Sequence, residues 1–173
     1  MSAKIIWLTG LSGSGKTTLS NAISRIFKKK NYKVKIIDGD NFRKKSNATN
    51  KFSLKSIYEN NISIIKFVKK IKNKYDFIIL SVISPLLKTR KIAKKNFEKD
   101  YFEIFVDCKI KTLEKRDTKG LYIKAKQKKI KNLIGYNSNI KYQKSKYKKI
   151  YINTDKLNVK ESVKAIFKGI KLS

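Results

Sequence analysis

The stretch that decides the fold runs from position 10 to position 17 and reads Gly10-Leu11-Ser12-Gly13-Ser14-Gly15-Lys16-Thr17. A short apolar run, residues 4–9, comes directly before it. After it, apolar residues recur at helical spacing, at Leu19, Ala22, Ile23 and Ile26. A glycine-rich loop between a strand and a helix points its N–H groups, and the positive end of the helix, at an anion. The stretch therefore predicts a loop that holds the phosphates of ATP.

Each residue type in this loop has a task. The glycines let the backbone bend inward, Lys16 places a cation between the β- and γ-phosphates, and Thr17 offers a hydroxyl to Mg²⁺. The alternative is a chance glycine- and serine-rich turn, which the flanking strand and helix disfavour. We expect contacts to ATP from the whole run and the residue after it: Gly10, Leu11, Ser12, Gly13, Ser14, Gly15, Lys16, Thr17 and Thr18.

Length and composition indicate one globular domain over residues 1–173, because 40% of the residues are hydrophobic and can fill one core. The sequence contains no apolar run of transmembrane length and no signal-peptide pattern, so we expect a cytoplasmic protein without membrane contacts. Cys108 is the only cysteine and there is no histidine, which excludes an internal disulfide and any Ser/His or Cys/His dyad. The chemistry must use carboxylates, lysines, hydroxyls and a borrowed metal ion.

The formal net charge of +32 raises the alternative of a nucleic-acid-binding protein. Only four of the 44 basic residues are arginines, and the lysines are scattered over every predicted element. A nucleic-acid-binding protein more often clusters its basic residues on one face and uses arginine for bases and phosphates. We therefore interpret the lysines mainly as solvated surface residues and do not expect a nucleic acid to be the functional partner. The charge still attracts anions at low salt.

Apolar runs and helical spacing alternate along the chain, which predicts an α/β fold with a five-stranded parallel sheet, helices on both faces, and ligands at the carboxyl ends of the strands. The predicted strands are residues 4–9, 33–38, 77–83, 102–107 and 149–153. The predicted later helices lie near residues 62–71, 91–97, 111–116, 122–128 and 159–170. Two stretches lack periodicity: residues 44–51, a candidate loop over the substrate, and residues 132–148, a candidate lid or hinge, although plain surface loops are as common.

The second predicted strand ends in Asp38-Gly39-Asp40-Asn41-Phe42-Arg43. Asp40 could accept a proton from an attacking hydroxyl or hold Mg²⁺ through water, and Arg43 could grip an anionic acceptor with both arms of its guanidinium. An ordinary turn rich in Asp and Asn is the alternative.

Taken together, these runs resemble the adenylylsulfate kinases, which phosphorylate the 3′-hydroxyl of adenylyl sulfate to make PAPS. The further matching runs are Phe52-Ser53, Glu59-Asn60, Ile83-Ser84-Pro85, Phe105-Val106-Asp107, Arg116-Asp117, Lys119-Gly120-Leu121-Tyr122 and Lys124-Ala125. The resemblance implies a P-loop kinase fold, ATP and Mg²⁺ as cofactors, and a homodimer.

The resemblance also implies roles for individual residues. Catalysis would fall to Lys16, Asp40 and Ser84, and the metal to Thr17 and Asp40. Ser84 lies where the family's reported phosphoserine intermediate lies; direct in-line transfer, with a structural role for Ser84, is the alternative. Arg116 would contact ATP and begin a lid of residues 116–148. The expected acceptor contacts are Asp38, Asp40, Asn41, Arg43, Phe52, Asn60, Ile83, Ser84, Lys119, Leu121, Asn132 and Leu133.

The sequence departs from the family mainly around the acceptor. An anion-gripping arginine is replaced by Ile57, an aromatic-arginine pair by Leu86-Leu87, and the Gly-Phe of the lid by Asn132-Leu133. Loss of an aromatic ring that stacks on a base costs about 1 to 3 kcal/mol. Two acceptors therefore stay open: adenylyl sulfate, with lysines such as Lys55 or Lys88 replacing lost arginine charge, or another nucleotide such as cytidine diphosphoramidate from capsule pathways.

Overall fold

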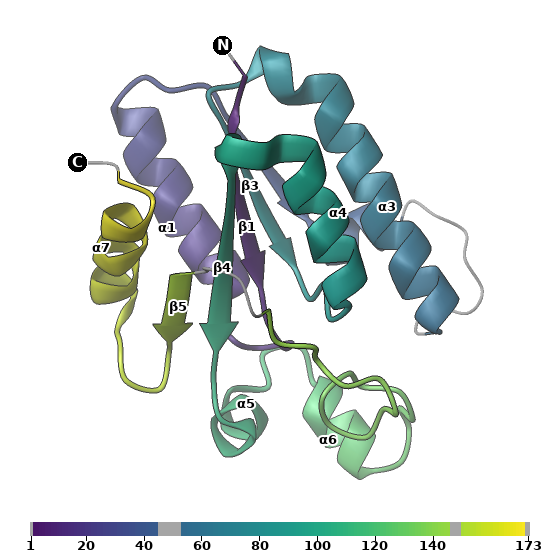
Figure 1. Cartoon of the computed structure of the whole chain (residues 1–173). Coiled ribbons are helices and arrows are strands. Elements are labelled where there is room, and N and C mark those ends of the chain that lie inside the picture. The colour runs from purple at the N-terminus through teal and green to yellow at the C-terminus, as the bar shows by residue number, and fades with distance from the viewer. Residues whose placement is uncertain (1, 45–52, 146–149, 172–173) are drawn as a thin grey trace.

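The computed structural model describes residues 2–44, 53–145 and 150–171. It contains a parallel sheet of five strands in the order β2-β3-β1-β4-β5 (Figure 1). The strands are β1 (Lys4–Thr9), β2 (Val34–Asp38), β3 (Phe77–Val82), β4 (Tyr101–Asp107) and β5 (Ile150–Asn153). The predicted α/β fold is confirmed, and since all strand pairs are parallel, their carboxyl ends meet at one edge.

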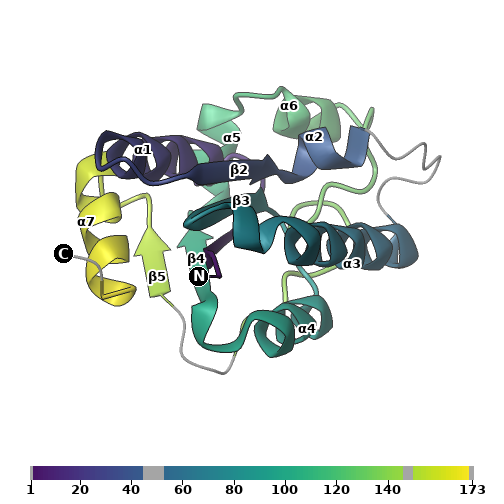
Figure 2. The same cartoon turned by 90° about the horizontal axis from the view of Figure 1, so that it is seen from above.

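Long helices cover both faces of the sheet, as Figures 1 and 2 show. On one face, α1 (Lys16–Lys29) and α7 (Val159–Gly169) pack on a buried cluster that includes Leu8, Ile79 and Ile104. On the other face, α3 (Leu54–Ile71) and α4 (Leu87–Phe97) pack on a cluster around Trp7 and Ile64. The central strands are buried on both sides, which explains why β3 is a continuous apolar run up to Ser81.

Short helices gather at the carboxyl edge of the sheet: α2 (Gly39–Lys44), α5 (Ile110–Arg116) and α6 (Leu121–Lys126). Beside α5 and α6, a third cluster of buried residues comprises Cys108, Leu113, Tyr122, Ala125 and Leu133. Two 3₁₀ turns, η1 (Lys72–Lys74) and η2 (Glu98–Asp100), lead into β3 and β4 at the opposite edge. The carboxyl edge therefore carries its own small core, separate from the two that hold the sheet.

Most element bounds agree with the sequence prediction to within one or two residues. The exceptions lie in three helices: α4 begins at Leu87 instead of residue 91, α3 begins at Leu54 instead of residue 62, and α2 was not predicted. The Ser53 hydroxyl oxygen caps α3 by accepting from the Ser56 N–H at 3.1 Å. Residues 132–145 form turns and coil, as their lack of periodicity predicts, whereas the helix predicted over residues 122–128 ends at Lys126. The predicted loop over the substrate lies outside the described residues from position 45 onward.

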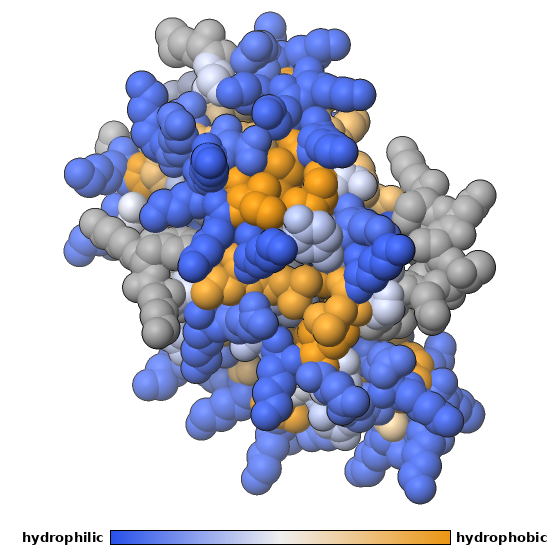
Figure 3. All heavy atoms as spheres, turned by 45° about the vertical axis from the view of Figure 1, so that its right-hand side comes forward, coloured by the Kyte–Doolittle hydropathy of each residue, from blue (hydrophilic) through white to orange (hydrophobic). Residues whose placement is uncertain are grey.

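The surface is strongly hydrophilic. Figure 3 shows hydrophilic side chains surrounding an apolar area on the side of α3 and α4, where Ile62, Phe67, Ile71 and Ile92 are only partly buried. Within the described part of the chain, none of the helices combines the length and the apolar character that crossing a bilayer requires.

Candidate active site

The phosphate loop links the end of β1 to the start of α1. Gly15, which precedes the helix, has a left-handed backbone with φ 95°, and among the described residues no side chain caps the first turn. Gly10 is also required, since a Cβ there would lie 2.2 Å from the Val106 carbonyl oxygen of β4. The free N–H groups and positive end of the 14-residue helix therefore point into space that a phosphate can occupy.

Lys16 is buried within this loop. Its Nζ donates to the Leu11 carbonyl at 2.6 Å and to the Ser14 hydroxyl at 3.4 Å. Burial, together with the nearby charge of Lys119, lowers the pKa of Lys16 to about 8, while Asp40 and Asp38 oppose the shift. The ammonium group is thus poorly compensated, and an anionic phosphate beside it would restore its charge balance.

Thr17 and Asp38 connect the phosphate loop to the end of β2. The Thr17 hydroxyl donates to Asp38 Oδ2 at 3.3 Å, while Oδ1 of the same carboxylate accepts from the backbone N–H groups of Asp40 and Asn41 at 3.0 and 3.2 Å. The Asp-rich turn considered from the sequence is therefore real, because Asp38 starts α2 as a cap. It also fixes Asp40 and Asn41 at the mouth of the phosphate loop.

Asp40 forms an ion pair across the site with Lys119, whose Nζ lies 2.5 Å from Oδ2. Burial alone would raise the pKa of Asp40, but the hydrogen bond and charge of Lys119, assisted by Arg43, hold the pKa below its ordinary value. Asp40 is consequently ionised at neutral pH. The pair brings the segment before α6 into contact with the turn after β2.

Ser84 follows β3 with an unusual backbone, since its φ of 43° is left-handed for a residue with a side chain. Its hydroxyl donates to Asn61 Oδ1 at 2.6 Å, and the Asn61 amide nitrogen donates to the Ile57 carbonyl one turn earlier in α3 at 2.8 Å. Both residues are buried, and both line the cleft described below. The Ser84 hydroxyl is thus held by an amide, with no basic group among its described hydrogen-bond partners.

At the other end of the site, Arg116 holds the loop that follows β5. Its guanidinium donates to the Thr154 carbonyl at 2.7 Å and to the Thr154 hydroxyl oxygen at 3.1 Å. Asp155 accepts from the Lys109 N–H at 2.7 Å and from the Cys108 thiol at 3.4 Å. Burial raises the pKa of that thiol, so Cys108 stays a neutral packing residue.

A single cleft of about 1240 Å³ joins all these groups. It extends from the loop after β5, past the phosphate loop, to the ends of β2 and β3 and the neighbouring turn of α3. Pockets for one drug-sized ligand measure about 300 to 1,000 Å³. The volume suits two ligands that meet at the phosphate loop.

Comparison with known proteins identifies the family. The model of the family described as adenylylsulphate kinase matches residues 2–153. The chain belongs to the adenylylsulphate kinase family. This membership makes it an ATP-dependent kinase with an alcohol group as phosphate acceptor.

Relatives support this membership along the whole chain. The adenylyl-sulfate kinase of Clostridium acetobutylicum is 34% identical over 167 residues, which are 96% of this chain and 82% of the relative. A probable adenylyl-sulfate kinase of Archaeoglobus fulgidus is 34% identical over 88% of this chain and 96% of its own length. The Mycobacterium tuberculosis APS kinase, solved in complex with AMPPNP and APS, superposes with a TM-score of 0.85 at 28% identity, over 98% of both chains.

In this member of the adenylylsulphate kinase family, most of the residues singled out from the sequence line the cleft. They are Ser12, Gly13, Gly15, Lys16, Thr17, Thr18, Asp38, Asp40, Asn41, Arg43, Asn60, Ile83, Ser84, Arg116, Lys119, Leu121 and Leu133. Gly10, Leu11, Ser14 and Asn132 do not line it, and the Asn132 side chain is exposed to solvent. Phe52 lies outside the described residues, so its predicted acceptor contact remains a prediction.

Sequence analysis missed two groups of residues that line the cleft. Asn61 interrupts the apolar face of α3 between Ile57 and Ile64, and a polar residue in such a stripe was the available signal. Thr154 and the residues that follow it up to Val159 gave no signal, because they are a short polar connection between β5 and α7. Arg116 contacts this connection through both the carbonyl and the hydroxyl of Thr154.

The structure shows where two of the residues that depart from the family pattern lie. Ile57 is only 2% exposed and packs within α3, so it is an interior residue, not an open position beside the acceptor. Leu133 is also buried, but it lines the cleft as part of the small core next to α6. Position 133 therefore faces the cleft, whereas position 57 can affect the cleft only through the packing of α3.

The oxygen atoms at the phosphate loop fit Mg²⁺. Mg²⁺ is usually held by one or two carboxylates together with substrate phosphates and waters, at short distances in octahedral geometry. The Thr17 hydroxyl and the Asp38 carboxylate already lie 3.3 Å apart beside the mouth of the loop, with Asp40 following Asp38 in α2. The described residues contain no cluster of three or more acidic, Cys or His side chains that could hold a metal ion.

Proposed function

We propose that this protein transfers the γ-phosphate of ATP to the 3′-hydroxyl of adenylyl sulfate, giving PAPS, as a step of sulfate assimilation. The observation that carries the proposal is the continuous cleft, which joins an intact phosphate loop to polar side chains at the ends of β2 and β3. Family membership over residues 2–153 supplies the reaction class. Relatives named adenylyl-sulfate kinase, and the APS kinase solved with APS, favour adenylyl sulfate over cytidine diphosphoramidate.

On the donor side, the phosphate loop and the first turn of α1 bind the phosphates through backbone N–H groups. Lys16 exchanges its contact with the Leu11 carbonyl for the β- and γ-phosphates, which raises its pKa again. Arg116 and the connection after β5 enclose the far end of the cleft, where the base of ATP is accommodated.

On the acceptor side, Asp40, Asn41 and Arg43 of α2 face Asn60 and Ser84 across the cleft. Arg43 offers a planar fork for the sulfo-phosphate group. Lys119 and Leu133 enclose the acceptor from the segment around α6. The acceptor therefore binds among side chains drawn from four separate elements.

Transfer then depends mainly on positioning and on electrostatic stabilisation of the moving phosphoryl group. Asp40, being ionised, accepts the proton of the 3′-hydroxyl or orients that hydroxyl, and Lys16 stabilises the charge on the transferred oxygens. Bound at Thr17 and Asp38, Mg²⁺ would neutralise charge on the β- and γ-phosphates. The segment around α6 excludes water, which would otherwise take the phosphoryl group.

Ser84 acts in this proposal as a positioning group, not as a covalent relay. Its hydroxyl donates to the Asn61 amide oxygen, and a relay would need a base to remove its proton. Replacing Ser84 with Ala is expected to lower kcat about fivefold, the effect of one lost hydrogen bond of about 1 kcal/mol. A loss of several thousandfold, with a phosphoserine recovered from the wild type, would establish the relay instead.

The decisive experiment supplies the pure protein with Mg-ATP and one candidate acceptor at a time, and follows ADP release. Adenylyl sulfate is expected to give turnover and a product with a 3′-phosphate. Turnover with cytidine diphosphoramidate, and none with adenylyl sulfate, would contradict the proposal and assign the enzyme to the other acceptor.

The nucleic-acid-binding alternative is tested by the salt dependence of binding. It requires tight association with DNA or RNA at physiological salt, falling steeply as salt rises, together with little kinase activity. The kinase proposal expects only weak, nonspecific association at low salt, driven by the charge of +32.

We also propose that the protein forms a homodimer and works in the cytoplasm, where ATP is available. Light scattering coupled to size-exclusion chromatography measures the mass directly. A mass near the 20.1 kDa of one chain at micromolar concentration would contradict the dimer.

A further inference from the structure

Arg90 of α4 takes no part in the mechanism proposed above. Its side chain is completely buried, at 0% exposure, and it does not line the cleft. Burying a charged group costs several kcal/mol unless partners compensate for the lost water. The partners of Arg90 therefore indicate what this charge is retained for.

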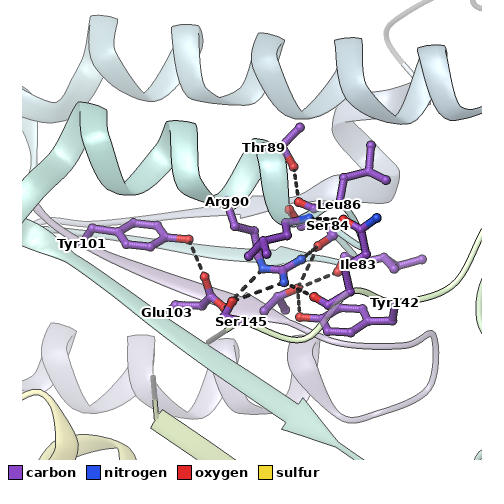
Figure 4. Close-up of polar contacts among 12 residues, drawn as sticks. Ile83, Ser84, Leu86, Thr89, Arg90, Tyr101, Glu103, Tyr142 and Ser145 are labelled. Carbon is purple, nitrogen blue, oxygen red and sulfur yellow. Dashed lines mark hydrogen bonds and ion pairs between the residues drawn. The ribbon is translucent and has the colours of Figure 1, made fainter. Parts of the chain in front are cut away.

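Figure 4 shows the guanidinium of Arg90 at the centre of a polar network. Its Nε lies 3.2 Å from the Glu103 carboxylate of β4, which balances the charge. Nη1 donates to the Ser84 carbonyl at 2.5 Å. Nη2 donates to the Gln143 carbonyl and, at 3.3 Å, to the Ser145 hydroxyl. One side chain thus reaches β4, the turn after β3, and the segment that returns from α6 toward β5.

Arg90 contacts Ser84, the cleft residue with the strained backbone. Ser84 has φ 43°, and this backbone conformation aims its hydroxyl at Asn61 within the cleft. Its carbonyl is held by Arg90, and the preceding Ile83 carbonyl accepts from the Thr9 hydroxyl at 2.6 Å. A left-handed non-glycine residue persists only where its surroundings impose it, and Arg90 is part of that constraint.

The contacts with residues 142–145 fix the returning segment against the same turn. The Gln143 N–H donates to the Pro85 carbonyl at 2.9 Å, and the Leu87 N–H donates to Gln143 Oε1 at 2.8 Å. The ring of Tyr142 lies under the guanidinium, 4.9 Å from its carbon, and its hydroxyl lies 3.0 Å from the Thr9 hydroxyl. Thr9 is the last residue before the phosphate loop.

We propose that Arg90 is a positioning residue that fixes three parts of the active site relative to one another. These are the Ser84 turn, the start of the phosphate loop at Thr9, and the end of the segment that covers the cleft. By fixing the carbonyl groups of Ser84 and Gln143 with one rigid fork, Arg90 sets where the acceptor hydroxyl lies relative to the donor phosphate. The catalytic part of this inference rests on the proposed function.

A purely structural ion pair makes a different prediction from a positioning residue. Replacing both partners of a buried ion pair with apolar residues of similar volume is often neutral for stability. The double variant Arg90→Met/Glu103→Leu therefore removes the fork without leaving a buried charge. The control is Thr89→Val, because Thr89 is also fully buried in the first turn of α4 but bonds only the Leu86 carbonyl among the contacts drawn in Figure 4.

The experiment measures the unfolding midpoint, the Kd for AMPPNP, and the kcat and KM for adenylyl sulfate. For the double variant we expect wild-type-like folding, AMPPNP binding within about threefold of wild type, and a kcat lowered by about 10²-fold, the usual effect of misplacing reacting groups by about 1 Å. Thr89→Val should keep kcat within about threefold of wild type. Wild-type kcat in a folded double variant would overturn the proposal.

Hydrogen exchange separates a failure of this inference from a failure of the proposed function, because it needs no substrate. The amides of Leu87 and Gln143 are expected to exchange at least about tenfold faster in the double variant than in wild type and in Thr89→Val. Unchanged exchange at both amides would overturn the proposal even if the enzyme phosphorylates a different acceptor. If the double variant does not fold, Arg90→Lys is judged by the same criteria, because it keeps the charge beside Glu103 but loses the fork.

Discussion

The donor and acceptor ends of the cleft are built in opposite ways. The donor end uses one continuous run, Gly10 to Thr17, and offers mainly backbone N–H groups at the start of α1. The acceptor end uses side chains from α2, α3, the end of β3 and the segment around α6. A site made of backbone N–H groups keeps its ligand when the side chains around it are substituted. A site made of side chains changes its ligand when one of those residues is substituted. The chemistry of the donor is therefore readable from a short motif, and the identity of the acceptor is not.

The largest expected effect is at Lys16, the charged side chain of the phosphate loop. Replacing Lys16 with Ala should lower kcat by about 10³-fold or more with every acceptor, because charge on the transferred oxygens loses its nearest cation. Steady-state ADP release measures this loss. Lys28→Ala, an exposed lysine of the same helix, is the matched control and should be unaffected. Substantial activity in Lys16→Ala would contradict the assignment of the phosphate loop as the donor end of the cleft.

A change at Phe52 should act on the acceptor alone. If its ring stacks on the acceptor base, Phe52→Ala should raise the KM for adenylyl sulfate by about 5- to 150-fold, which corresponds to about 1 to 3 kcal/mol. The KM for ATP should stay within about twofold of wild type. Phe52→Leu separates loss of the ring from loss of apolar volume. Equal effects of Phe52→Ala on both substrates would show that the two ends are not independent.

Alkaline pH should weaken the donor end. The pKa of Lys16 is about 8 in the ligand-free protein, so the fraction of charged Lys16 falls about fivefold between pH 8 and pH 9. We expect the Kd for AMPPNP to rise accordingly between pH 8 and 9, with proton uptake on binding, both measurable by calorimetry. Stability should change in the opposite direction, because a lysine whose pKa is lowered by folding destabilises the folded state while it is charged. This cost is full below pH 8, declines as the pH rises above 8, and is gone only above the ordinary lysine pKa of 10.5.

Lys16→Ala supplies the control for this pH dependence, because it has no ammonium group at the site. Its weak residual AMPPNP binding should not change between pH 8 and 9. A pH dependence that persists in the variant would assign the effect to another group.

The smallest expected effect is a gain at the acceptor end. Leu133→Phe should lower the KM for adenylyl sulfate about threefold, because about 1 to 3 kcal/mol of stacking is partly offset by the cost of fitting a larger residue into a packed cluster. Ile123→Phe, on the exposed face of α6, is the control. A Leu133→Phe enzyme that binds adenylyl sulfate no better would show that position 133 does not set specificity.

The sequence predicted the donor side well because its signals are local. The strand, the glycines and the helix around Lys16 occupy consecutive positions, and hydrophobic periodicity located all five strands. In the sequence, Ile57 stands where the family has an anion-gripping arginine, which suggests restoring an arginine at this position. The structure argues against that, since a charge at a side chain only 2% exposed would be buried without a partner.

Contacts between distant positions could not be predicted in the same way. Ser84 meets Asn61 across 23 residues, and Arg90 meets Gln143 across 53, so no short pattern records either pairing. The role of Thr154 depends on where β5 ends beside the phosphate loop, which is a property of the assembled sheet. For such residues the fold had to be known before the site could be assembled.

Gly135 lies in close contact with Leu11 of the phosphate loop. A Cβ on residue 135 would lie 2.5 Å from Leu11 Cδ2, and Tyr122 ties the same part of the molecule to the phosphate loop through its hydrogen bond to the Ser12 carbonyl at 2.9 Å. A larger residue at 135 would have to displace the Leu11 side chain and would adopt a strained left-handed backbone, since φ is 76°. Substitution at position 135 would therefore disturb the phosphate loop, although the two lie far apart in the sequence.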